Sequence, residues 1–88
     1  MNVIDEIPQP HRDTLVAVLA ERDPRLLAAL RHSTLPTEEQ WDTVSETLNY
    51  ALADHWGPDH VPDETGVRID NALGAFMTRW PNDQLAGS

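Results

Sequence analysis

The sequence has no cysteine among its 88 residues, and its six basic residues are all arginine. Disulfide bonds, thiolate catalysis and cysteine-ligated zinc are therefore excluded. No apolar run approaches the ~20 residues that a membrane-spanning helix needs. The N-terminal residues also lack the basic segment and apolar stretch of a signal peptide. From these absences, and from the arginine bias that is typical of GC-rich coding genomes, we expect a bacterial cytoplasmic protein without membrane contact.

Positive charge is scarce as well, because fifteen acidic residues stand against six basic ones and the formal net charge is −9. Binding to nucleic acid or anionic lipid depends on lysine and arginine near the phosphates. A chain with this charge is repelled by both. The composition therefore predicts no direct nucleic-acid binding and leaves a basic protein, or a cation, as an acceptable partner.

The common catalytic motifs are missing. The sequence contains no G-x-S-x-G, no P-loop, no G-x-G-x-x-G and no H-E-x-x-H. The serines at positions 33, 45 and 88 have no histidine and carboxylate pattern around them. We predict that the protein is not an enzyme and that it uses no cofactor.

What the chain does contain is helical patterning. Apolar residues make up 40% of it, which suits one small globular domain. Their spacings of three and four predict helices, and no segment alternates with the period of two that a strand requires. We therefore predict an all-α fold, either a small four-helix bundle or an irregular helical domain, over residues 10–81. An extended arm over residues 1–9 and a flexible tail over residues 82–88 complete this prediction.

Capping residues and prolines set the expected helix boundaries. The first helix is expected from about Pro10 to Arg22, and the second opens with Asp23 as N-cap and Pro24 behind it. The third begins with the capping box of residues 37–40 and stops at Trp56-Gly57-Pro58, and the fourth covers about residues 65–80. The predicted buried faces are Leu15, Val18 and Leu19; Leu26, Leu27 and Leu30; Trp41, Val44, Leu48, Leu52 and His55; and Ile69, Ala72, Leu73, Phe76, Met77 and Trp80.

The stretch ADHWGPDH, residues 53–60, is the one candidate for a metal site. Zinc takes about four ligands, mostly histidine and cysteine with an occasional carboxylate. The side chains that could supply them are Asp54, His55, Asp59 and His60. Their spacing matches no usual zinc motif, and a helix exit at Gly57-Pro58 explains the same residues. We interpret the stretch as a helix stop and keep the metal site as an alternative.

A row of polar residues along the third predicted helix is more informative. It recurs every four residues and consists of Glu38, Asp42, Glu46, Tyr50 and Asp54, which we call the acid–tyrosine row. Like charges at this spacing are mildly destabilising on a helix. The row is either a solvated face, with Arg68 and Arg79 of the fourth helix available to pair with it, or a docking face for a basic partner.

Three hypotheses for function follow. The first is a small acidic module that binds and regulates, or blocks, a basic partner protein, as immunity proteins and antitoxins do. The second is a homo-oligomeric structural protein, since the three tryptophans and the nearly all-apolar first helix are a large apolar load for so short a chain. The third is metal binding at the turn of residues 54–60.

Overall fold

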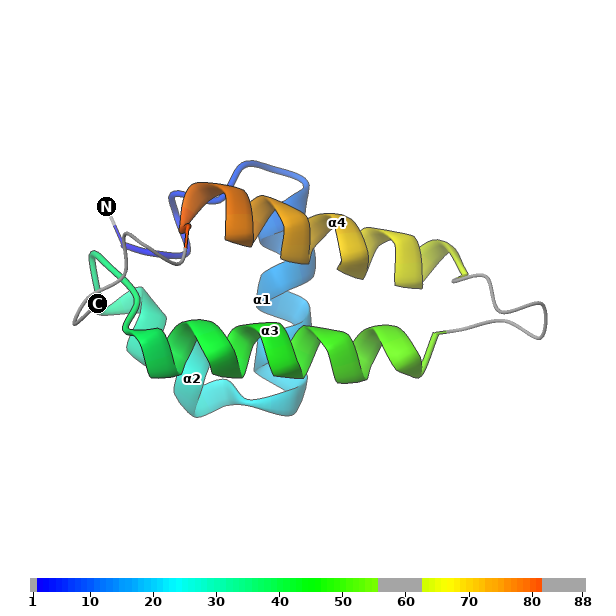
Figure 1. Ribbon diagram of the computed structural model, residues 1–88, viewed down its shortest axis with the longest axis horizontal. Coiled ribbons are helices and arrows are strands. Elements are labelled where there is room, and N and C mark those ends of the chain that lie inside the picture. Colours follow the sequence, from blue (N-terminus) through cyan, green and yellow to red (C-terminus); the bar gives the residue numbers. More distant parts are fainter. Residues whose placement is uncertain (1, 56–62, 82–88) are drawn as a thin grey trace.

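The computed structural model describes residues 2–55 and 63–81 of the chain. Within these residues the chain forms four helices and no strand, which confirms the all-α prediction (Figure 1). The helices are α1 (His11–Arg22), α2 (Pro24–Arg31), α3 (Glu38–Ala53) and α4 (Glu64–Arg79).

The helices pack as an irregular domain. Helices α3 and α4 lie side by side and antiparallel, and α1 crosses behind both of them at a steep angle (Figure 1). The short α2 follows α1 after a sharp bend at Asp23 and packs against α1 and the first half of α3. Helix α1 is therefore central, in agreement with the apolar run LVAVLA at residues 15–20.

One hydrophobic core joins all four helices. The predicted buried faces of α1 and α2 are confirmed, and α3 and α4 turn their predicted apolar stripes inward, with Trp41, Leu52 and Met77 partly buried at the edge. Buried side chains come from each helix and from the segment before α1: Val3, Ile4, Ile7, Leu15, Val18, Leu19, Leu26, Leu27, Leu30, Val44, Leu48, Ala51, Ile69, Ala72, Leu73, Phe76 and Trp80.

Local hydrogen bonds at the helix starts explain where the helices begin. The side chain of Asp23 accepts from the backbone N–H of Leu26 at 3.1 Å, and Pro24 stands at the first helical position. Thr37 and Gln40 form both bonds of the predicted capping box, each at 3.0 Å. These starts are therefore fixed by residues within the same turn.

The segment before α1 packs into the core, and its backbone is folded into turns rather than extended as predicted. Backbone bonds run from the N–H of Glu6 to the carbonyl of Asn2 and from that of Ile7 to that of Ile4. These turns allow Val3, Ile4 and Ile7 to be buried together, which a straight arm with alternating side chains does not permit. The arm is thus part of the folded domain.

Helix α3 ends at Ala53, three residues before the predicted stop at Trp56. The backbone N–H of His55 bonds to the carbonyl of Leu52 at 3.0 Å, a tighter turn than that of an α-helix. His55 therefore lies in the turn after α3 rather than on its apolar face. Residues 56–58 and the predicted tail, residues 82–88, lie outside the described residues.

No helix in the described parts of the chain is long and apolar enough to cross a membrane.

Candidate partner-binding surface

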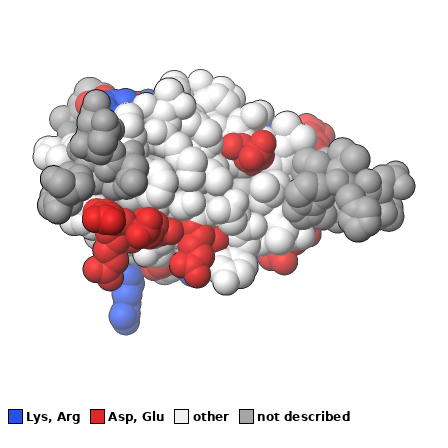
Figure 2. Space-filling model, in the orientation of Figure 1, with Lys and Arg blue, Asp and Glu red and all other residues white. Residues whose placement is uncertain are grey.

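The acid–tyrosine row follows one exposed face of α3. All five of its residues are exposed, and the apolar stripe of the helix faces the other way, into the core. Figure 2 shows acidic side chains gathered along the lower edge of the molecule, over the first half of α3. The five predicted residues are thus all on the solvent side of α3, and the row turns round the helix axis by about 40° at each step.

One member of the row is engaged by a basic residue that the sequence did not single out. Arg22, at the end of α1, donates to the Asp54 carboxylate over 2.6 Å. The pairing that we considered from the sequence, through α4, is not formed. Arg68 instead pairs with Glu64 on its own helix at 2.6 Å, and Arg79 pairs with Glu6 at 3.2 Å.

The other three acids of the row have no such partner. Within residues 2–55 and 63–81, no ion pair involves Glu38, Asp42 or Glu46. Glu39, on the flank of the row, lines a separate hollow towards α2, where Arg25 is also present. Glu38, Asp42 and Glu46 are therefore exposed acids of α3 without an ion pair in the described structure.

Tyr50 is the most exposed large apolar side chain of the described chain, at 63% of its full exposure. It lines two surface hollows, and Ala53 lines both of them as well. The Arg22 hollow, of about 440 Å³, is lined by Arg22, Asp23, Thr47, Tyr50, Ala53 and Asp54. The Glu46 hollow, of about 500 Å³, is lined by Asp42, Ser45, Glu46, Asn49, Tyr50 and Ala53. Aromatic residues supply anchors in protein interfaces, so Tyr50 is the candidate anchor of this face.

A second cluster joins the end of α3 to the start of α4. The His55 Nδ1 and Asp63 Oδ2 atoms lie 3.1 Å apart, and the backbone N–H of Asp63 donates to the His55 carbonyl at 2.8 Å. Asp63 also caps α4, because its Oδ1 accepts from the N–H of Gly66 at 2.7 Å. The Gly66 bond, followed by the interactions with His55, lowers the pKa of Asp63 below its ordinary value.

These contacts bear on the metal alternative. Asp54 and His55 are adjacent in sequence but turn to different partners, Arg22 and Asp63. Asp59 and His60 lie outside the described residues. Within the described residues, no group of three or more histidine, cysteine, aspartate or glutamate side chains is placed to hold an ion.

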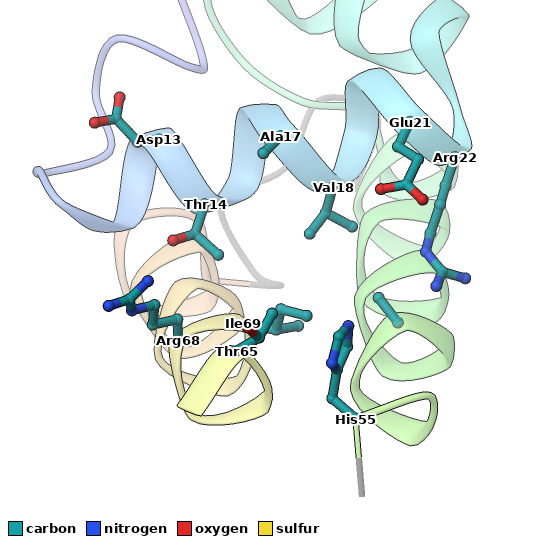
Figure 3. A pocket seen from close by; sticks show the side chains of 11 residues that line it. Asp13, Thr14, Ala17, Val18, Glu21, Arg22, His55, Thr65, Arg68 and Ile69 are labelled. Atoms are coloured by element: carbon teal, nitrogen blue, oxygen red, sulfur yellow. The ribbon is translucent and has the colours of Figure 1, made fainter. Parts of the chain in front are cut away.

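His55 also borders a groove of about 330 Å³ between α1, the end of α3 and the start of α4. In Figure 3 its ring points into the groove towards α1, and Val18 and Ile69 lie at the apolar floor. The hydroxyl groups that line the groove are those of Thr14 and Thr65, and neither forms a hydrogen bond with His55. Covalent catalysis is recognised by a nucleophile that is hydrogen-bonded to its base. Among the described residues that line the groove, no hydroxyl group is bonded to His55 in this way.

Comparison with protein-family models, with curated proteins and with solved structures gave no match for this chain. The assignment of a function therefore depends on the chemistry of its own surfaces.

Sequence reasoning identified the acid–tyrosine row but missed Arg22. The residue stands in the last turn of α1, where a positive charge is explained by the helix dipole alone. Its partner Asp54 is 32 positions away in the chain. The only signal in the sequence was Asp54 itself, an acid at the negative end of a helix, where a compensating positive charge is expected.

Proposed function

We propose that this protein is a small acidic interaction module whose acid–tyrosine row binds a basic surface of a partner protein and so regulates or blocks that partner. The observation that carries the proposal is the face of α3, where Glu38, Asp42 and Glu46 are exposed without a described ion-pair partner and lead up to the exposed Tyr50. Acidic side chains steer a basic partner towards such a face, and an aromatic residue provides the anchor.

The second hypothesis, a homo-oligomer, is not supported by any separate feature of the described structure. Its motive was the large apolar load of the chain, and the core of a single copy already buries Phe76 and Trp80 and partly buries Trp41. It stays a prediction, and the native mass of the protein in solution tests it.

A capture experiment from the source lysate tests the proposed function. Wild type and the double variant Asp42→Arg/Glu46→Arg are used as baits at low and high salt. We expect a partner that wild type retains at low salt, and that both the double variant and high salt release, because salt screens exposed charges.

The matched control is Asp5→Arg/Asp70→Arg, which changes the net charge by the same amount at two exposed positions outside α3. This control is expected to retain the partner. Equal retention by wild type and the α3 variant would remove the row as the docking face, and equal loss by both variants would show that only overall charge matters. Circular dichroism of all baits verifies that they are folded.

A further inference from the structure

The surroundings of Tyr50 repeat on its two sides. Glu46 precedes it by four residues and Asp54 follows it by four, so each acid lies about 6 Å from it along the axis of α3. Each acid lines one of the two hollows that the tyrosine also lines. Tyr50 therefore shares a hollow with the carboxylate before it and another with the carboxylate after it.

Towards the end of α3, an arginine pairs with the acid and forms part of the wall of the hollow. The guanidinium group of Arg22 reaches Asp54 at 2.6 Å, and both residues line the Arg22 hollow together with Tyr50. The arginine side chain comes from α1 and not from α3. The molecule thus contains an example of an arginine from another element held beside Tyr50 by an acid of the row.

Around Glu46, no basic residue of the described chain takes the corresponding place. The described residues that line the Glu46 hollow all belong to α3, and none of them is basic. Two carboxylates, Asp42 and Glu46, lie one turn apart on its wall, while Ala53 leaves room beside the tyrosine. Its charge and its recess complement a long cationic side chain.

We propose that the Glu46 hollow receives an arginine side chain of the basic partner and that Glu46 pairs with it, as Asp54 pairs with Arg22 further along α3. This inference rests on the proposed function and specifies the chemistry of the partner. Arginine fits better than lysine for two reasons. Its planar guanidinium group stacks on an aromatic ring and donates two parallel bonds to a carboxylate, and it gives up water more easily than an ammonium group.

The test uses two blocked peptides, octa-arginine and octa-lysine, as probes. Because Tyr50 is the only tyrosine of the chain, its ring signals in NMR spectra report on this site alone. We expect octa-arginine to shift these signals and to bind about two- to fivefold more tightly than octa-lysine, the range of an exposed contact between a cation and an aromatic ring.

Three variants locate the effect. Tyr50→Leu is expected to remove the preference for arginine while weaker binding of both peptides remains, as followed by amide signals of α3. Glu46→Gln is expected to weaken octa-arginine binding more than Asp70→Asn, which removes the same charge from an exposed position on α4. Thermal melting verifies that each variant is folded.

The outcomes separate the inference from the proposed function. Equal affinities of the two peptides for wild type, or a preference for arginine that Tyr50→Leu leaves unchanged, would overturn the arginine pocket and leave a basic docking face in place. If neither peptide shifts the signals of Tyr50 or of the α3 amides, both the docking face on α3 and the arginine site within it are rejected.

Discussion

The indole Nε1 of Trp41 donates a hydrogen bond to the backbone carbonyl of Trp80 over 2.8 Å. This bond ties the first turn of α3 to the last residue of the α4 region. Beside it, the guanidinium group of Arg79 lies 4.0 Å from the centre of the Trp80 ring and pairs with Glu6 of the N-terminal segment. Three parts of the chain that are far apart in sequence thus meet at this end of the molecule.

Replacing Trp41 by phenylalanine is expected to lower the free energy of unfolding by about 1–2 kcal/mol. The variant loses the bond to the Trp80 carbonyl and part of the packed indole ring, and a net hydrogen bond alone contributes about 0.5–1.5 kcal/mol. Urea unfolding followed by circular dichroism measures the change.

The comparison for this variant is Trp80→Phe. The Nε1 of Trp80 is buried and has no hydrogen-bond partner in the described structure, so its removal relieves an unsatisfied donor while some packing is lost. The two effects oppose each other, and we expect a change below about 1 kcal/mol. A larger loss from Trp80→Phe than from Trp41→Phe would contradict this assignment of the two indoles.

The lowered pKa of Asp63 predicts a pH-dependent difference between wild type and Asp63→Asn. A carboxylate with a depressed pKa in the folded state contributes stability above its unfolded value of about 3.9 and loses it as the pH falls through the folded value. Since asparagine is itself a good N-cap, this substitution mainly removes the charge. Wild type should melt at a higher temperature than the variant at pH 7, and the difference should close towards pH 2.

Asp70→Asn is the control for this comparison, because Asp70 is an exposed aspartate of α4 whose side chain forms no hydrogen bond in the described structure. Its melting temperature is expected to follow that of wild type over the whole range. A constant difference between wild type and Asp63→Asn from pH 7 to pH 2 would mean that the charge of Asp63 does not stabilise the cap.

Ile7→Ala tests whether the segment before α1 belongs to the folded domain. Ile7 is fully buried, and truncating a buried isoleucine to alanine costs about 2–5 kcal/mol. Val67→Ala, at an exposed position of α4, should change stability by less than about 0.5 kcal/mol. Chemical denaturation of both variants decides the matter, since an arm that is detached in solution would make the two changes equally small.

Gly74→Ala is expected to stabilise the protein by up to about 1 kcal/mol. Gly74 is exposed in the middle of α4, and a Cβ atom added to it meets no atom within 4 Å. Alanine has a higher helix propensity than glycine, and its added methyl group meets no steric clash at this position. A lower midpoint of unfolding would show that the glycine has a role that the helix alone does not explain.

The parts of this fold that follow from the sequence are those in which the interacting residues are close together in the chain. The capping box of Thr37 and Gln40 spans one turn, and so does the cap of Asp23 on α2. The spacing of apolar residues likewise fixes which face of a helix is buried, because the period of a helix is constant. For the same reason the acid–tyrosine row could be recognised as one exposed face before the helices were placed.

The remaining features depend on contacts between segments that are far apart in the chain. No local pattern specifies that α1 crosses α3 and α4, that the N-terminal segment folds into turns over the core, or that Arg22 reaches Asp54 across 32 positions. These arrangements depend on how the apolar faces pack together, and the helical period gives the direction of each face but not its neighbour. Tertiary packing therefore pairs Asp54 with Arg22 and leaves Glu46, one turn before Tyr50, without an ion pair among the described residues.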